Sequence, residues 1–160
     1  MDIRQVRYDH PDAVTLAAEV QLEYMERYGN GEGDATVLRT DEFDPPHGLY
    51  LLAYDADDRP VATGGWRSQE KNDEGYSDGD AEIKRMYVTV AARGLGLARR
   101  VLARLEEDAR AAGRTRMVLE TGIKQPEAIA LYRSSGYTDC AKFGHYRNDP
   151  LSRCLAKPLI

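Results

Sequence analysis

The chain has 160 residues, 42% of them hydrophobic and 31% charged, a composition typical of one globular domain covering residues 1–160. No apolar run approaches the ~20 residues that a membrane span needs, and the N-terminus has no apolar signal core. We therefore expect a cytoplasmic protein without a membrane partner. Two cysteines and three scattered histidines exclude a disulfide framework, and no metal site is expected.

The net charge of −5 is unevenly distributed along the chain. Residues 1–80 carry 19 acidic and 7 basic side chains, a net charge of −12, whereas residues 82–116 carry 4 acidic and 9 basic side chains, a net charge of +5. The acidic half would repel nucleic acid, which we exclude as a partner, and would attract a cationic acceptor such as a small amine or a basic peptide end. Arg93, Arg99 and Arg100 lie near a predicted helix start, where we expect them to contact phosphate.

The first half of the chain predicts a strand, a long helix and a hairpin. Residues 3–8 alternate as a strand, and a helix is expected from Pro11, a residue favoured in first helical turns, to Tyr28. A loop with a short helical piece in its middle follows. The next expected elements are hairpin strands over residues 49–54 and 61–66, a polar loop, and a strand over residues 81–90.

The second half contains the strongest helical pattern of the chain. Apolar residues occupy one side of residues 95–112, and Gly113 gives a natural stop. These apolar residues are Leu97, Val101, Leu102, Leu105 and Ala109. The elements expected after this helix are a strand over 116–121, a short helix over 126–134, and a final antiparallel pair over 140–146 and 153–157.

A short glycine-containing turn joins the strand over 81–90 to this helix. It reads Arg93-Gly94-Leu95-Gly96-Leu97-Ala98. The first N–H groups of a helix have no intrahelical partner, so a turn of small residues can direct several of them at one anion. Side chains larger than that of glycine at Gly94 and Gly96 would obstruct such a close approach. The turn therefore predicts a cradle for a pyrophosphate.

A second motif follows, with Gln125 and Ala128 upstream of Leu131-Tyr132 and Gly136-Tyr137. Together the two motifs resemble those of the acyl-CoA N-acyltransferases of the GNAT superfamily. The first matches the pattern Arg/Gln-x-x-Gly-x-Gly/Ala at Arg93, Gly96 and Ala98. The second matches Asn-x-x-Ala-x-x-Leu-Tyr-x-x-x-Gly-Phe/Tyr, with Gln125 where Asn is usual. The resemblance implies an α+β fold in three layers (α/β/α): a mixed, mostly antiparallel twisted sheet of six to seven strands, about four flanking helices, and a splayed strand pair at the CoA site.

The resemblance also implies how acetyl-CoA, the cosubstrate, is held. Main-chain groups of Met86, Tyr87 and Val88 are expected to contact the pantetheine and the thioester, with an N–H near Val88 where the oxyanion forms. The implied contacts continue through Arg93, Gly94, Leu95, Gly96, Leu97, Ala98 and Arg99, and include Gln125. The other implied partner is an amine acceptor. Dimers are frequent in the family, so a homodimer is also an expectation.

Three side chains are candidates for proton transfer. By the resemblance, Tyr132 is the general acid that protonates the departing thiolate. Glu82 and Glu120, on the strands before and after the main helix, are alternative general bases, acting directly or through water. Strand alternation places Glu82 on the same face as Lys84 and Met86. An ion pair between Glu82 and Lys84 is the purely structural interpretation.

Two other functions compete with acetyl transfer. A catalytically silent CoA-binding sensor or interaction module would keep the cradle without turnover. A dinucleotide-binding unit would also place two glycines after a strand, but Arg99 occupies the position of its third glycine. For an acetyltransferase, the residues expected to form aromatic walls of the acceptor pocket are Tyr24, Tyr28, Trp66 and Tyr146.

Overall fold

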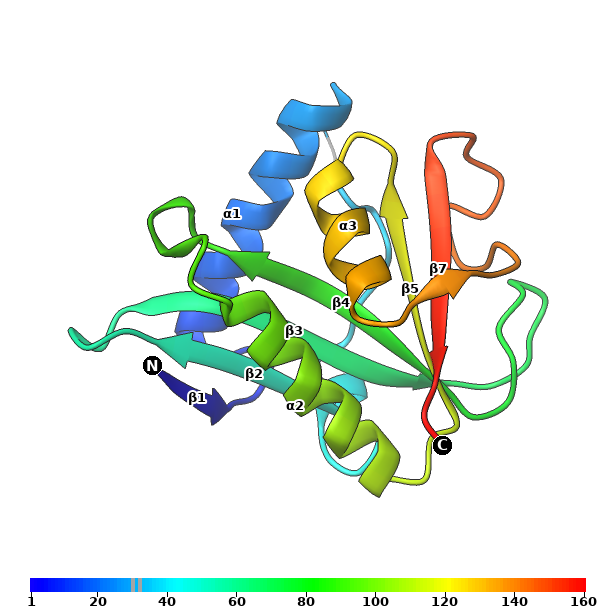
Figure 1. Ribbon diagram of the computed structural model, residues 1–160, viewed down its shortest axis with the longest axis horizontal. Helices are drawn as coiled ribbons and strands as arrows, with labels where there is room; N and C mark the ends of the chain where they lie inside the picture. The colour runs from blue at the N-terminus through cyan, green and yellow to red at the C-terminus, as the bar shows by residue number, and fades with distance from the viewer. Residues whose placement is uncertain (30, 32) are drawn as a thin grey trace.

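The computed structural model describes residues 1–29, 31 and 33–160, and its centre is a twisted sheet with helices on both faces (Figure 1). In these residues the sheet has seven strands in the order β1-β2-β3-β4-β5-β7-β6. The strands are β1 (Asp2–Gln5), β2 (Gly48–Tyr54), β3 (Pro60–Gln69), β4 (Asp80–Val88), β5 (Arg116–Gly122), β6 (Thr138–Asp139) and β7 (Ser152–Pro158). All neighbouring strands are antiparallel except β4 and β5. The expected α+β fold is confirmed.

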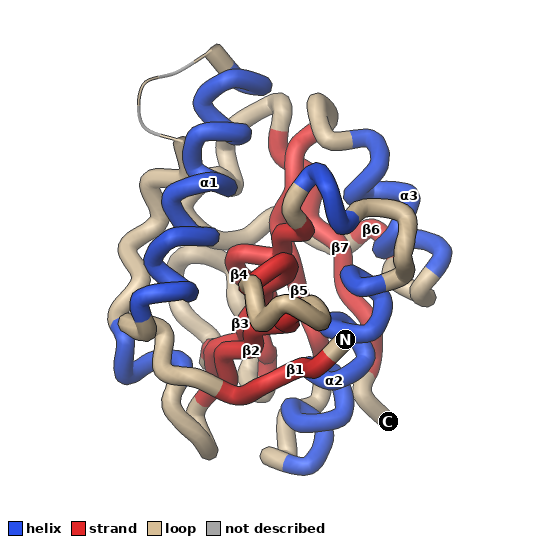
Figure 2. The backbone as a smooth tube through the Cα atoms, turned by 90° about the vertical axis from the view of Figure 1, so that its left-hand side faces the viewer, coloured by secondary structure: helices blue, strands red, loops and turns tan. Residues whose placement is uncertain are grey.

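Helix α1 (Pro11–Tyr28) covers one face of the sheet, and α2 (Leu97–Ala111) and α3 (Pro126–Ser134) cover the other (Figure 2). The described residues contain these three α-helices and two short 3₁₀ turns, Thr40–Phe43 and Val90–Ala92, where the sequence predicts about four helices. Local signals explain the bounds of α1: Pro11 begins it, and the His10 Nδ1 atom accepts a hydrogen bond from the Asp12 N–H at 3.0 Å. Among the described residues, no helix has the length and apolar character needed to cross a bilayer.

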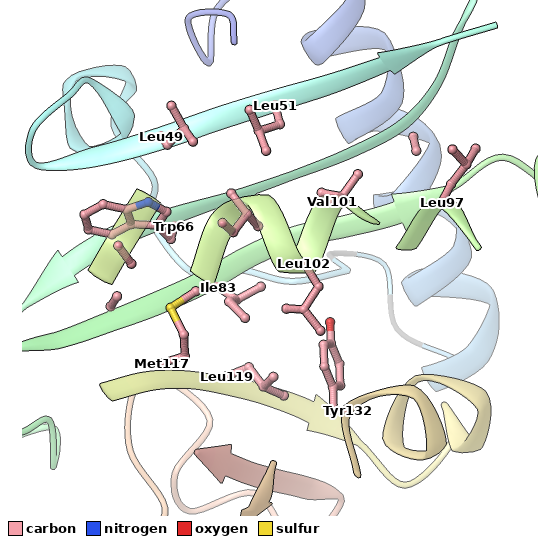
Figure 3. Packing of buried hydrophobic residues seen from close by; sticks show 14 of the residues in the cluster. Leu49, Leu51, Trp66, Ile83, Leu97, Val101, Leu102, Met117, Leu119 and Tyr132 are labelled. Carbon is pink, nitrogen blue, oxygen red and sulfur yellow. The ribbon is translucent and has the colours of Figure 1, made fainter. Parts of the chain in front are cut away.

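The main core lies between the sheet and α2 (Figure 3). The apolar face predicted for α2 is the one that is buried there, with Val101, Leu105 and Ala109 fully inaccessible to solvent. Trp66 of β3 is also fully buried in this core, and its indole N–H donates to Asp108 of α2 at 2.9 Å. The expectation that Trp66 is a wall of the acceptor pocket is therefore wrong, because the side chain faces the underside of α2.

The strands β4 and β5 separate soon after they meet. Their parallel pairing covers only residues 80–82 of β4 and 116–118 of β5, and the remainder of each strand has no partner on that side among the described residues. The splayed strand pair expected from the resemblance is present. Its consequence is a gap in the middle of the sheet, with unpaired main-chain groups along one edge of β4.

A β-bulge changes the direction of side chains along β4. Its register against β3 shifts between Thr63 and Gly65, and Arg85 opposite this shift has a φ of 61°. A bulge inserts one extra residue, so side chains beyond it point to the other face. Lys84 contacts Asp34 near α1, whereas Met86 packs into the core under α2. The prediction that Glu82, Lys84 and Met86 share one face is therefore wrong.

The segment after β6 does not form the strand predicted over residues 140–146. Only residues 138–139 pair with β7 as a strand, and the Cys140 N–H still donates to the Cys154 carbonyl at 3.0 Å. Phe143 then leaves the sheet and is buried against Tyr76, with ring centroids 5.0 Å apart. Gly144, at a φ of 79°, donates its N–H to the Glu74 carbonyl at 2.8 Å. Phe143 thus packs on the β3–β4 loop, and the segment does not extend the sheet.

Replacing Tyr76 by Phe should destabilise the fold by about 1–2 kcal/mol, because the buried Tyr76 hydroxyl donates to the Glu82 carboxylate at 2.9 Å. Urea unfolding followed by circular dichroism measures this difference. Tyr8→Phe is the matched control, since the Tyr8 hydroxyl has no hydrogen bond in the described part of the chain, and a change within about 0.5 kcal/mol is expected there. Equal effects of the two variants would show that the Tyr76 hydroxyl contributes nothing.

Candidate active site

Two cavities adjoin where β4 and β5 separate. The first has a volume of about 200 Å³ and lies between β4, β5, α1 and the C-terminal segment around Tyr146. The second, of about 330 Å³, runs along the end of β4 and the start of α2. Met86, Gln125, Ala128 and Tyr132 line both of them. The two cavities therefore meet at the side chain of Tyr132, and we call them the acceptor cavity and the cradle groove.

The cradle groove contains the glycine turn that the sequence singles out. Gly94 and Gly96 have φ values of 84° and 76°, which L side chains rarely adopt, and Gly96 directly precedes α2. A Cβ atom at either glycine would find no other atom within 4 Å. The glycines are therefore required by the backbone conformation, and the space above the turn is open. The first N–H groups of α2 can face an anion there.

Ten of the eleven residues expected to contact acetyl-CoA line this groove. They are Met86, Tyr87, Val88, Arg93, Gly94, Gly96, Leu97, Ala98, Arg99 and Gln125. Leu95 does not line the groove, and its side chain is exposed. The groove, its small-residue turn and the unpaired edge of β4 together fit an elongated ligand with a pyrophosphate at one end.

Three arginines near this turn have partners within the protein. Arg93 donates through Nε to the Val88 carbonyl and through Nη2 to Glu23, both at 3.0 Å. Arg99 donates to Ser134 at 2.7 Å. Arg100 donates to the Met1 carbonyl at 3.3 Å and does not line the groove. Of the three arginines expected at the phosphates, only Arg93 and Arg99 lie at the groove.

Tyr132 of α3 lies at the junction of the two cavities and is only 6% exposed. Its ring packs against Tyr137 in an edge-to-face arrangement, with centroids 5.7 Å apart. Burial raises the pKa of the Tyr132 phenol above its usual value. The Tyr132 hydroxyl has no hydrogen-bond partner among the described residues, so the donor of this protonated phenol is not used within the protein.

Glu120 of β5 lines the acceptor cavity. Burial raises its pKa to about 7, although the positive charge of Lys84 opposes that rise. A carboxylate with this pKa exchanges a proton near neutral pH, which suits a general base.

Glu82 has a different environment. Its carboxylate, 3% exposed, accepts hydrogen bonds from Arg67 at 2.8 Å, Gln69 at 3.0 Å and Tyr76 at 2.9 Å. It lines neither cavity, and Arg67 also contacts Glu42 at 3.0 Å. The carboxylate is fully bonded in a network that connects β3, β4 and the β3–β4 loop.

Three of the four aromatic residues expected at the acceptor line the first cavity, namely Tyr24, Tyr28 and Tyr146. The Tyr28 hydroxyl is 3.1 Å from Gln125 Oε1, and the Tyr146 hydroxyl accepts from the Ala35 N–H at 2.6 Å. The acidic residues of the β3–β4 loop line neither cavity.

Sequence reasoning missed a charged cluster in the acceptor cavity. The Asp34 carboxylate accepts hydrogen bonds from Lys84 at 2.8 Å and from Arg85 at 2.7 Å. Among the described residues Lys84 therefore pairs with Asp34, and not with Glu82 as the structural interpretation of the sequence expected. Burial opposes ionisation of Asp34, but the two cations hold its pKa below its usual value. Gln21 of α1 fixes Asp34 by bonding both its N–H and its carbonyl. No sequence signal connects Asp34 to β4, because the contact spans about fifty residues of chain.

The described acidic, histidine and cysteine side chains do not form a metal site. In the described ranges, no group of three or more His, Cys, Asp or Glu residues is arranged to hold a metal ion.

Comparisons with known proteins agree with this geometry. The model of the acetyltransferase (GNAT) family matches residues 15–137. An IAA acetyltransferase of Azospirillum brasilense is 51% identical over 81 residues, covering 51% of this chain and 53% of that protein. The uncharacterized N-acetyltransferase YsnE of Bacillus subtilis is 36% identical over 80 residues, covering 49% of this chain and 53% of that protein. The match thus spans about half the length of these curated relatives.

Solved structures share the fold over nearly the whole chain. A candidate acyl-CoA N-acyltransferase from Klebsiella pneumoniae superposes with a TM-score of 0.79 at 29% identity, covering 99% of this chain and 97% of that one. An aminoglycoside 6'-N-acetyltransferase complexed with coenzyme A has a TM-score of 0.69 at 16% identity, covering 100% of this chain and 98% of that one. At this identity the similarity shows the fold alone. Because the family model covers most of the sequence, including both motifs, this chain belongs to the GNAT acetyltransferase family.

Proposed function

We propose that this protein transfers an acetyl group from acetyl-CoA to a primary amine by direct attack in a ternary complex. The observation that carries the proposal is the meeting of the cradle groove and the acceptor cavity at Tyr132. A donor held in one cavity and an amine held in the other would have their reacting atoms next to the same phenol. Bringing two reactants together in this way supplies a large part of the rate acceleration of group-transfer enzymes.

The donor would be held mainly by the backbone. The open turn at Gly94 and Gly96 and the first N–H groups of α2 would bind the pyrophosphate. The unpaired edge of β4 at Met86–Val88 would bond the pantetheine and direct an N–H at the thioester oxygen. Arg93 and Arg99 would contribute positive charge beside the phosphates.

Proton transfer would be divided between Glu120 and Tyr132. Glu120 removes a proton from the ammonium group, and the neutral nitrogen then attacks the thioester carbon. The new C–N bond forms and the C–S bond breaks as Tyr132 gives its proton to the departing thiolate. The nitrogen then releases its second proton, which returns the Tyr132 phenolate to the phenol. We propose Glu120 as the base in preference to Glu82, because Glu120 lines the acceptor cavity whereas Glu82 is saturated by three donors outside it.

Tyr132→Phe should lower kcat by about 10²-fold, since the thiolate would leave without a proton donor. Thiol release from acetyl-CoA measures the rate, and the shift of Tm produced by acetyl-CoA measures binding, which should be unchanged. Tyr54→Phe is the control, because the Tyr54 hydroxyl bonds Asp12 away from both cavities.

Full activity of Tyr132→Phe would contradict its role as the acid. A wild-type protein that binds acetyl-CoA but acetylates no amine would instead support the alternative of a silent CoA-binding module.

The pH profile should identify the base. Only the ionised Glu120 can accept a proton, so kcat/KM should rise with pH through an apparent pKa of about 7 and then level off. Glu120→Gln should remove this limb and lower activity, whereas Glu82→Gln should retain the limb even if it lowers stability. A limb that disappears in Glu82→Gln and persists in Glu120→Gln would assign the base to the other carboxylate.

A further inference from the structure

The acceptor cavity contains two consecutive cationic side chains that the proposed proton transfers do not use. Lys84 and Arg85 line the cavity, with side chains only 8% and 5% exposed. Consecutive residues of a regular strand point to opposite faces. Here the bulge, with Arg85 at a φ of 61°, brings both side chains to the same oxygen, Oδ2 of Asp34. A strained backbone at a non-glycine residue of a cavity wall is typical of a functional site.

The two cations keep hydrogen-bond donors that Asp34 does not use. One carboxylate, that of Asp34, serves both, and it uses a single nitrogen from each. Arg85 uses only Nη1 on Asp34, and Lys84 Nζ makes one of its three possible hydrogen bonds among the described residues. Buried cationic donors that lack partners are costly, and arginine is well suited to bind a carboxylate. This part of the wall can therefore accept a second anionic group.

Acidic side chains line another part of the same cavity. Glu120 and Asp149 both belong to its wall, and Asp149 is fixed by the Leu151 N–H, which donates to its carboxylate at 2.8 Å. Lys84 and Glu120 are close enough to interact electrostatically across the gap between β4 and β5. The cavity thus presents cationic and acidic side chains that interact with one another, together with three tyrosines in its wall.

We propose that the acceptor is an α-amino acid or a close analogue, whose carboxylate is bound by Lys84 and Arg85 while its amine faces Glu120. This inference rests on the proposed function and narrows it, because an α-amino acid carries a carboxylate beside its amine, as the cavity carries cationic side chains beside Glu120. The cavity volume of about 200 Å³ suits a ligand of that size. Tyr24, Tyr28 and Tyr146 favour an apolar or aromatic side chain on the acceptor. The proposed acceptor is therefore a zwitterion, whereas the net charge of the chain suggested a cationic acceptor.

Matched pairs of acceptors test the proposal. Thiol release from acetyl-CoA is measured with L-phenylalanine against phenethylamine and with L-leucine against 3-methylbutylamine, so that each pair differs only in the carboxylate. We expect kcat/KM to be at least tenfold higher for the amino acid of at least one pair. In Arg85→Gln and in Lys84→Gln that advantage should fall at least tenfold through KM. The comparison is made at a pH above the Glu120 limb, because Lys84 also lowers the pKa of Glu120.

Controls separate binding from folding. Arg59→Gln removes a cation at the exposed β2–β3 turn, where Arg59 pairs with Asp57 at 3.0 Å, and should leave the preference intact. Thermal unfolding of each variant with acetyl-CoA checks that the fold and the cradle groove persist. If Arg85→Gln is unfolded, Lys84→Gln gives the result alone. The shift of Tm by each amino acid and each amine in the presence of CoA measures binding without turnover.

The outcomes distinguish the carboxylate site from the acetyltransferase function. Acetylation of both members of each pair with equal kcat/KM, or an equal loss for both in the folded variants, would overturn the carboxylate site while the acetyltransferase function stands. A protein stabilised by acetyl-CoA that neither acetylates nor binds the amino acids would also overturn it. If acetyl-CoA itself gives no stabilisation, the proposed function fails.

Discussion

The site depends on the short pairing of β4 with β5. After three paired residues the two strands lose their ladder hydrogen bonds, and the sheet is held together there by apolar packing under α2. Ile83 of β4 and Leu119 of β5 belong to the same core, together with Tyr132 of α3 (Figure 3). Because burial of apolar surface is non-directional, this packing tolerates a gap that a hydrogen-bonded ladder would close. The gap provides both cavities and the free main-chain edge of β4.

The bulge at Arg85 is the second constraint. It shifts the pairing register of β3 and β4 at a point opposite Gly64, and the side chains that follow point to the other face. Met86 consequently joins the core under α2, while Lys84 and Arg85 both reach Asp34 on the other face. The irregular residue Arg85 therefore places Met86 in the core under α2 and the charged side chains in the wall of the acceptor cavity.

The two candidate carboxylates show how environment decides a role. Glu82 is buried but surrounded by donors from Arg67, Gln69 and Tyr76, so its charge is compensated and its function is to connect strands and loop. Glu120 is half-buried with far less compensation, and its pKa rises to about 7. Glu82 and Glu120 have the same side chain and lie on neighbouring strands. Their surroundings nevertheless give Glu82 a structural role and suit Glu120 to exchange protons at neutral pH.

The sequence by itself determined the order of elements, the bounds of α1 and α3, the apolar face of α2 and the glycine turn before it, because these depend on local backbone preferences and on helical or strand periodicity. Tertiary structure alone decided which side chains share a cavity. The pairing of Lys84 and Arg85 with Asp34, the burial of Trp66 under α2 and the departure of residues 140–146 from the sheet all depend on contacts between distant segments. A single extra residue in β4 reversed its facing pattern, and strand periodicity contains no information on where such an insertion occurs.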